Sequence, residues 1–171
     1  MGCSRQRRGL WYITPRSASI GQPLGEGPKR PYNVGMDADP IIAAIQAAYH
    51  NVQAIYLFGS YGTRDEWPTS DVDIALLLPH GCARSAGSLA LSEVRFTLER
   101  LLHRDVDLIN LRLVSTVLQK EVISADRRIF CADAYAVDEF EMMTLSFYAK
   151  LGDERRGILE QFRETGRAYE V

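Results

Sequence analysis

The sequence predicts an α/β (α+β) fold in which helices surround strands that cluster in one sheet. Short apolar runs suit buried strands, and the longer segments between them repeat apolar residues every three or four positions, as amphipathic helices do. Hydrophobic residues make up 46% of the 171 residues, which is enough for the core of one domain. The expected order of elements is α-β-β-α-β-α-β-α-α, without an internal repeat.

The first 36 residues differ in composition from the rest of the chain. Their basic residues and prolines are Arg5, Arg7, Arg8, Arg16, Lys29 and Arg30, with Pro15, Pro23, Pro28 and Pro31. This composition predicts a flexible basic extension over residues 1–36 that makes little contact with the core. We therefore expect one domain over residues 37–171 that ends in a helical segment, and Met36 is an alternative start of the working chain.

The first expected elements of this domain are a helix and two strands. The helix covers residues 39–50, with Asp39 as its cap and Pro40 in its first turn. Residues 53–58 and 71–78 are short apolar strands joined by a polar loop.

The middle and the end of the chain supply the remaining elements. We expect a helix, a strand, a helix and a strand at residues 89–102, 106–109, 114–121 and 128–131. The inward side of the first of these helices is predicted from spacing to carry Leu91, Val94, Leu98, Leu101 and Leu102. Residues 137–168 are expected to be helical with a break at Gly152-Asp153. Their apolar stripe suits a core or an interface, and it comprises Phe140, Met143, Phe147 and Leu151.

Charge, hydropathy and cysteine spacing exclude several classes of function. A formal net charge of -2 disfavours a general nucleic-acid coat, which would be strongly basic. No apolar run approaches the ~20 residues that a membrane-spanning helix needs. The cysteines lie far apart without metal-ligand spacing, which favours reduced thiols in a cytoplasmic protein.

Two aspartates on one predicted strand are the first sign of chemistry. Asp71 and Asp73 point the same way because alternate side chains of a strand share a face, whereas Val72 and Ile74 point into the core. Two carboxylates about 4 Å apart repel by roughly 4 kcal/mol at an effective dielectric of 20. A pair held on an apolar strand therefore favours a cation between its members, and Mg²⁺ prefers such oxygen ligands.

A third aspartate lies in the next predicted strand. Asp107 has apolar neighbours on both sides, and we prefer it to Asp105, which projects from the same face. If the two strands are neighbours, three carboxylates can hold two metal ions, an arrangement suited to in-line displacement at phosphorus. Asp107 is also placed to act as general base.

A glycine and a serine end the first predicted strand. Gly59 allows backbone N–H groups to approach a phosphate closely, and the Ser60 hydroxyl can bond a phosphate oxygen. Arg64 can bind the triphosphate tail. We include Ser70, directly before Asp71, among the expected nucleotide-binding residues.

The order and spacing of these residues resemble a known family. Gly59-Ser60, ten intervening residues, Asp71-Val72-Asp73 and a later strand aspartate resemble the DNA polymerase β nucleotidyltransferase superfamily, in particular its minimal members. The segments 140–148 and 155–160 resemble the MNT antitoxins that pair with HEPN-domain ribonuclease toxins.

The resemblance covers about residues 37–168 and implies a mixed sheet flanked by helices. It further implies that Gly59 and Ser60 hold the triphosphate of ATP and that Asp71, Asp73 and Asp107 bind Mg²⁺. AMP would pass to a hydroxyl group of a HEPN-type toxin, with a tyrosine as the expected acceptor. This modification would silence the toxin. Arg64 stands where many relatives carry glycine.

Two other functions stay open at this point. One is nucleotide transfer to a small molecule such as an aminoglycoside, for which no separate acceptor-binding domain is visible in the sequence. The other is an antitoxin that acts by docking alone with a dormant site, which the presence of all three aspartates disfavours.

Overall fold

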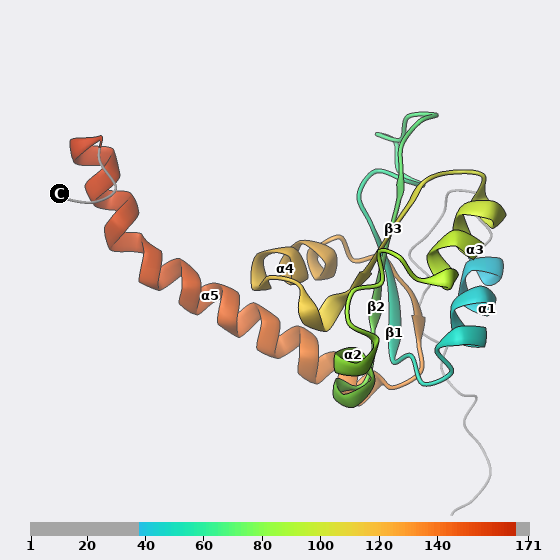
Figure 1. Ribbon diagram of the computed structural model, residues 1–171. Coiled ribbons are helices and arrows are strands. Elements are labelled where there is room, and N and C mark those ends of the chain that lie inside the picture. The colour runs from blue at the N-terminus through green and yellow to red at the C-terminus, as the bar shows by residue number, and fades with distance from the viewer. Residues whose placement is uncertain (1–37, 167–171) are drawn as a thin grey trace, which may run out of the picture.

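The computed structural model describes residues 38–166, which form one four-stranded mixed sheet with helices on both faces (Figure 1). The elements in chain order are α1 (Asp39–Ala48), β1 (Ala54–Phe58), β2 (Val72–Leu77), α2 (His80–Ala86), α3 (Glu93–Leu102), β3 (Val106–Asn110), the short 3-10 helix η1 (Leu111–Leu113), α4 (Thr116–Ser124), β4 (Arg128–Cys131) and α5 (Ala134–Thr165). The expected extension over residues 1–36 lies outside the described residues.

The sheet has the order β3-β2-β1-β4, in which β1 is antiparallel to both of its neighbours and β2 is parallel to β3. Phe58 at the end of β1 pairs with Asp73, and Asp73 pairs with Asp107. The end of β1 therefore meets the beginnings of β2, β3 and β4 at one end of the sheet. We call this the carboxylate end, and we call the other the arginine end because Arg112 lies there.

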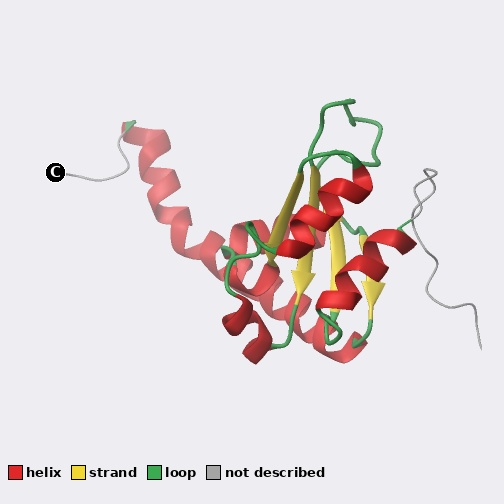
Figure 2. Ribbon diagram, turned by 45° about the vertical axis from the view of Figure 1, so that its right-hand side comes forward, coloured by secondary structure: helices red, strands yellow, loops and turns green. Residues whose placement is uncertain are grey.

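The core has two layers, one on each face of the sheet (Figure 2). One layer contains Ile55 and Leu57 of β1 and packs under α1 and α3, whereas Tyr56 lies in the other, under α4 and α5. Because the central strands are covered on both faces, residues 54–57 and 74–78 are buried without interruption. This explains why they read in the sequence as continuous apolar runs.

The cap of α1 and the start of α3 differ from the expectation. Asp39 is the first residue of α1 and lies in its first turn, because the cap position is held by Ala38 without a side-chain hydrogen bond. α3 begins at Glu93, where the Ser92 hydroxyl accepts a hydrogen bond from the Arg95 backbone. Residues before Ser92 are thus outside the helix.

The inward face predicted for α3 is partly wrong. Val94 and Leu98 are buried, but Leu91 precedes the helix and is 83% exposed. Leu101, in the last turn of the helix, is 43% exposed, whereas Leu102 packs against the core. Ridge positions 94 and 98, one turn apart, carry the packing against α1 and β3.

The short helix α2 was not predicted. Its sequence, with Gly81, Cys82, Arg84 and Ser85, has no apolar stripe of helical period, so its position depends on tertiary contacts. The buried Asn110 side chain donates hydrogen bonds of 2.9 and 3.0 Å to carbonyls at the end of this helix.

Helix α5 is continuous from Ala134 to Thr165, so the break expected at Gly152-Asp153 is wrong. A single glycine costs a helix only about 1 kcal/mol relative to alanine. The ion pair Lys150–Glu154 spans the glycine, and a second pair, Arg156–Asp153, directly follows it on the same helix, so both support the helix here.

The first half of α5 is fastened to the sheet, and its second half projects from the body (Figure 1). Glu141 accepts a 2.8 Å hydrogen bond from the Tyr56 hydroxyl and pairs with Arg128 at 3.0 Å. Val137 and Thr144 are buried, whereas few residues beyond Leu151 are covered. Of the helices in residues 38–166, none combines the length and apolar character needed to cross a membrane.

Candidate active site

The three predicted aspartates lie together at the carboxylate end of the sheet. Asp73 and Asp107 are direct partners across β2 and β3, whose spacing is about 4.8 Å in any sheet. Asp71 lies two residues before Asp73 and so projects from the same face. Val72 and Ile74 are fully buried on the opposite face, as the alternation predicted. The structure thus places the three acidic residues at the same end of the sheet, as neighbours of one another.

The carboxylates interact electrostatically. The pKa of Asp73 is raised above its usual value, first by burial and then by the negative charges of Asp107 and Asp71, while Arg127 lowers it. Within residues 38–166, no group of three acidic, histidine or cysteine side chains is already arranged around a point that could hold an ion. Mutual repulsion keeps carboxylates apart when no cation lies between them.

Gly59 places the turn after β1 directly on Asp73. Its φ is +65°, and a Cβ built on it would lie 1.9 Å from Asp73 Oδ2. No other residue fits this position, because a side chain would meet both the backbone restriction and the carboxylate. The glycine therefore allows the turn to lie directly against the Asp73 carboxylate, and its close approach to a phosphate stays a prediction.

The turn that follows Gly59 is closed by its own residues. The Ser60 carbonyl accepts hydrogen bonds from the Thr63 backbone at 3.0 Å and from the Thr63 hydroxyl at 2.6 Å. Gly62 N–H donates to Glu66 at 2.8 Å. Among the described residues, the N–H groups of Ser60 and Tyr61 have no such acceptor. These two donors are available to a phosphate.

The long loop between β1 and β2, at the top of Figure 1, is fastened by Arg104. The Arg104 guanidinium pairs with Glu66 at 2.8 Å and donates to the carbonyls of Trp67 and Ser70, both at 3.3 Å. It also lies over the Tyr61 ring, 5.2 Å from its centre. Sequence reasoning missed this role, because nothing in the sequence shows that Arg104, between α3 and β3, lies beside the loop.

Ser70 and Arg64 are less directly placed for nucleotide binding. The Ser70 hydroxyl accepts a 3.1 Å hydrogen bond from the Trp67 backbone, so it helps to close the loop. Arg64 is exposed near the tip of the loop. A nucleotide-binding role for either residue stays a prediction.

Arg127 is a further residue of the site that the sequence did not reveal. It is only 8% exposed, and its guanidinium donates to the Gly59 carbonyl at 3.1 Å and to the Tyr61 carbonyl. Its charge also acts on Asp73. Because the paired residues of β1 and β4 lie 72 to 77 positions apart in the sequence, only the sheet order brings Arg127 here.

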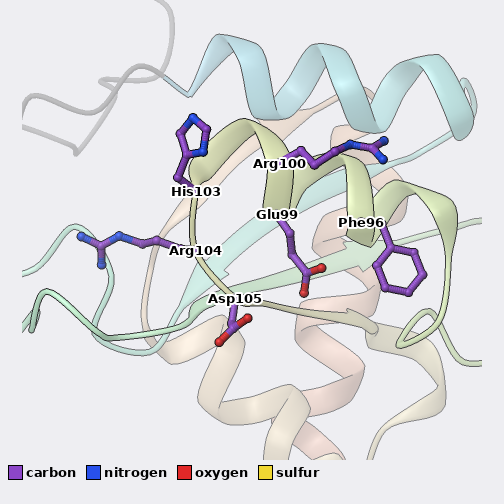
Figure 3. Close-up of a pocket in the computed structure, with 6 residues that line it drawn as sticks. All are labelled: Phe96, Glu99, Arg100, His103, Arg104 and Asp105. Atoms are coloured by element: carbon purple, nitrogen blue, oxygen red, sulfur yellow. The ribbon is translucent and has the colours of Figure 1, made fainter.

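A hollow on the outer side of α3 does not belong to this site (Figure 3). Its lining residues are Phe96, Glu99, Arg100, His103, Arg104 and Asp105, and it contains no residue of the turn or of the three aspartates. Asp105 lines this hollow and is not among the charges that act on Asp73. Of the two, Asp107 is the one beside Asp73, and its preference over Asp105 as a site residue stays a prediction.

Comparison with known families and proteins places this geometry in context. The family described as "Polymerase beta, Nucleotidyltransferase" matches residues 41–135, which include the turn, the three aspartates and Arg127. The protein adenylyltransferase MntA of Shewanella oneidensis is 33% identical over 126 residues, which are 73% of this chain and 86% of that protein.

Solved structures show the same likeness. A chain in the crystal structure of a toxin–antitoxin with AMP-PNP has a TM-score of 0.62 and 30% identity, with 75% of this chain and 99% of that chain covered. A chain in the complex of tri-AMPylated Shewanella oneidensis HEPN toxin with MNT antitoxin has a TM-score of 0.56 and 31% identity, with coverages of 73% and 94%.

Proposed function

This chain belongs to the polymerase β nucleotidyltransferase family, and on that premise we propose that it transfers AMP from ATP to a hydroxyl of a HEPN-type toxin and thereby acts as an antitoxin. The observation that carries the proposal is the placement of Asp71, Asp73 and Asp107 beside the Gly59–Ser60 turn. The likeness to MntA and to an antitoxin in complex with an AMPylated HEPN toxin supports the choice of acceptor.

The donor set fits Mg²⁺. Asp71, Asp73 and Asp107 supply only carboxylate oxygens, and the pKa of Asp73 is raised first by burial and then by the neighbouring negative charges, which a cation would offset. We propose that these three residues hold the ions, two in number. Bound Mg²⁺ would supply stabilisation of the charge that develops on the phosphate oxygens.

The residues of the chain have separate tasks in the transfer. The Ser60 hydroxyl and the free N–H groups of Ser60 and Tyr61 bind the phosphates of ATP, with Arg64 and Ser70 as further candidates. The acceptor oxygen attacks the α-phosphorus while the bond from that phosphorus to the bridging oxygen breaks, so that pyrophosphate leaves. Asp107, exposed at the start of β3, accepts the proton of the acceptor hydroxyl. A tyrosine is the proposed acceptor.

Helix α5 is the proposed contact surface for the toxin. Beyond its first two turns, its large exposed apolar side chains are Met142, Met143, Leu145, Phe147, Tyr148, Ile158, Leu159 and Phe162. The stripe that is buried at Val137 and Thr144 continues one and two heptads further at Leu151 and Ile158, where the body no longer covers it. An apolar helix face of this size suits association with another helical surface.

The cellular setting and the excluded partners follow the same reasoning. We propose a cytoplasmic location, because the thiols of Cys82 and Cys131 are free, as is usual for a reducing compartment. A nucleic acid is not the proposed acceptor, since the net charge of -2 provides no general attraction to phosphate backbones.

The proposal is tested by weighing both proteins. The purified chain and its co-purifying partner are incubated with Mg²⁺ and each NTP in turn, and intact masses are recorded. We expect the partner to gain one or more AMP units with ATP only, and a chelator to abolish the gain. A stable complex without any mass gain would identify an antitoxin that acts by docking and would contradict the enzymatic proposal.

A further inference from the structure

We propose that Arg127 is a positioning residue for the nucleotide, because its guanidinium sets the direction in which the Gly59–Ser60 peptide presents its N–H group. The inference rests on the proposed nucleotidyl transfer and deepens it. It concerns a residue at the start of β4, far in sequence from the turn that it holds.

Arg127 is locked in place from two directions. Its backbone carbonyl accepts a 2.9 Å hydrogen bond from Leu57 N–H in β1, which fixes Arg127 beside the end of that strand. Its guanidinium reaches past the strand end to the carbonyls of Gly59 and Tyr61. With 8% of its surface exposed, the side chain has little freedom to adopt another position.

Because the peptide bond is planar, the contact that holds a carbonyl also fixes the direction of the following N–H group. In a trans peptide, the carbonyl of one residue and the N–H of the next point in opposite directions. A Gly59 carbonyl held toward Arg127 therefore directs the Ser60 N–H to the other side of the turn. The next clamped peptide works in the same way, because the Tyr61 carbonyl faces Arg127 while Gly62 N–H donates to Glu66.

The positive charge of Arg127 provides a second contribution to nucleotide binding. Arg127 is the cation that acts on Asp73, next to two more carboxylates, and the proposed substrate adds a triphosphate to the same region. A buried guanidinium beside the turn offsets part of this negative charge. Its two carbonyl partners match the fork of arginine, whereas lysine would bring the charge without the fork.

A control variant of Arg112, at the arginine end, distinguishes an effect on nucleotide positioning from an effect on the stability of the fold. Arg112 also donates to a backbone carbonyl, that of Leu78 at 2.6 Å, and to the Gln53 side chain at 2.9 Å. It lies across the sheet from the turn and touches none of the residues of the candidate site. We compare Arg127→Met, Arg127→Lys and Arg112→Met in the full chain.

The experiment measures the dissociation constant of Mg²⁺–AMP-PNP by calorimetry, the melting temperature of each variant, and kcat and KM for ATP in toxin AMPylation. We expect Arg127→Met to weaken analogue binding by about tenfold or more and to raise KM more than it lowers kcat. Arg127→Lys should lie between wild type and Arg127→Met. Arg112→Met should bind within about twofold of wild type even though it melts earlier.

Three outcomes would overturn the inference. In the first, Arg127→Met binds the analogue as tightly as wild type does. In the second, Arg112→Met loses as much affinity for the analogue as Arg127→Met does. Wild type that binds no nucleotide would overturn the proposed function and the inference with it. If Arg127→Met does not fold, Arg127→Lys with an intact circular dichroism spectrum takes its place: about threefold or more weaker binding supports the inference, and unchanged binding contradicts it.

Discussion

The two ends of the four-stranded sheet both carry polar side chains, but their charges are arranged in opposite ways. At the arginine end, Arg112 donates to Leu78 and Gln53, contacts His80 Nε2 at 3.1 Å and lies over the Phe140 ring. At the carboxylate end, Asp73 lies beside two further aspartates, and burial and these like charges raise its pKa.

This difference separates stability from function within one small domain. Hydrogen bonds of Arg112 join η1 to the segments that follow β2 and precede β1, and Phe140 and the opposite charge of Glu139 lie beside it on α5, so loss of Arg112 should lower the free energy of unfolding. Like charges at the carboxylate end cost folding free energy, and stability therefore does not explain their presence. The predictions below test whether the two ends can be separated in this way.

The largest effect is expected from Asp71→Asn combined with Asp73→Asn. Removing two of the proposed ligands should lower AMP transfer by about a thousandfold or more, while the fold and toxin binding remain. Intact-mass kinetics and a pull-down measure the two properties. Transfer at the wild-type rate by this double variant would refute the assignment of the site.

A glycine at each end gives the next comparison. Gly59→Ala places a Cβ against Asp73 Oδ2 at a φ of +65°, so we expect transfer to fall by about a hundredfold. Gly81→Ala in α2 meets nothing within 4 Å and should leave transfer unchanged. Steady-state rates measure both variants, and equal losses would show that the turn has no special role.

The projecting part of α5 allows partner binding to be broken without loss of the site. Ile158 and Phe162 are 38% and 51% exposed, so Ile158→Asp with Phe162→Asp should keep the fold and weaken the toxin complex by about tenfold or more. Leu91→Asp, at a position 83% exposed near α3, is the control. Titration of toxin by calorimetry measures affinity, and unchanged binding in the α5 variant would exclude this surface.

A truncation of α5 should begin beyond Lys150, because Glu141 and Thr144 belong to the body.

Arg112→Met tests the arginine end. Loss of its hydrogen bonds should lower the free energy of unfolding by about 1–3 kcal/mol, or about 2–4 °C in Tm for each kcal/mol. Transfer at a temperature where the variant is folded should be unchanged. A variant with normal stability and impaired transfer would contradict the separation of the two ends.

The smallest effect concerns the stability of the metal-free protein. The pKa of Asp73 is raised in the folded state, so its contribution to stability is present below its ordinary value of 3.8 and is lost as pH rises through the raised value. Asp73→Asn should therefore melt about 2 °C higher than wild type at pH 7 without metal, the gain being small because solvent screens a half-exposed group. A Tm of Asp73→Asn equal to or below that of wild type would contradict the repulsion between Asp73 and its neighbouring carboxylates.

Much of the candidate site could be predicted because its signals are local. Asp71 and Asp73 alternate with buried residues on one strand, and Gly59-Ser60 directly follows another, so the spacing alone indicates a common face and a turn. Asp107 was recognised as an acid between apolar neighbours. Its registration with Asp73 then followed from the parallel pairing of β2 and β3.

The residues that were missed depend on contacts between distant parts of the chain. Arg127 and Arg104 reach the turn and its loop only through the sheet order and the end of α3, which no local pattern encodes. The helix α2 lacks an apolar stripe, and Gly152 carries too small a cost to end α5. In both cases, tertiary packing and neighbouring ion pairs outweigh the local propensity.

The most direct test of the carboxylate end is to locate the metal. Crystals of the chain with its toxin, grown with Mn²⁺ in place of Mg²⁺ and with AMP-PNP, would show the ion by anomalous scattering. We expect anomalous density bonded to Asp73 and Asp107, with the analogue's phosphates on the Ser60 N–H. Density for the analogue bound elsewhere, or Mn²⁺ bound away from these carboxylates, would contradict the account.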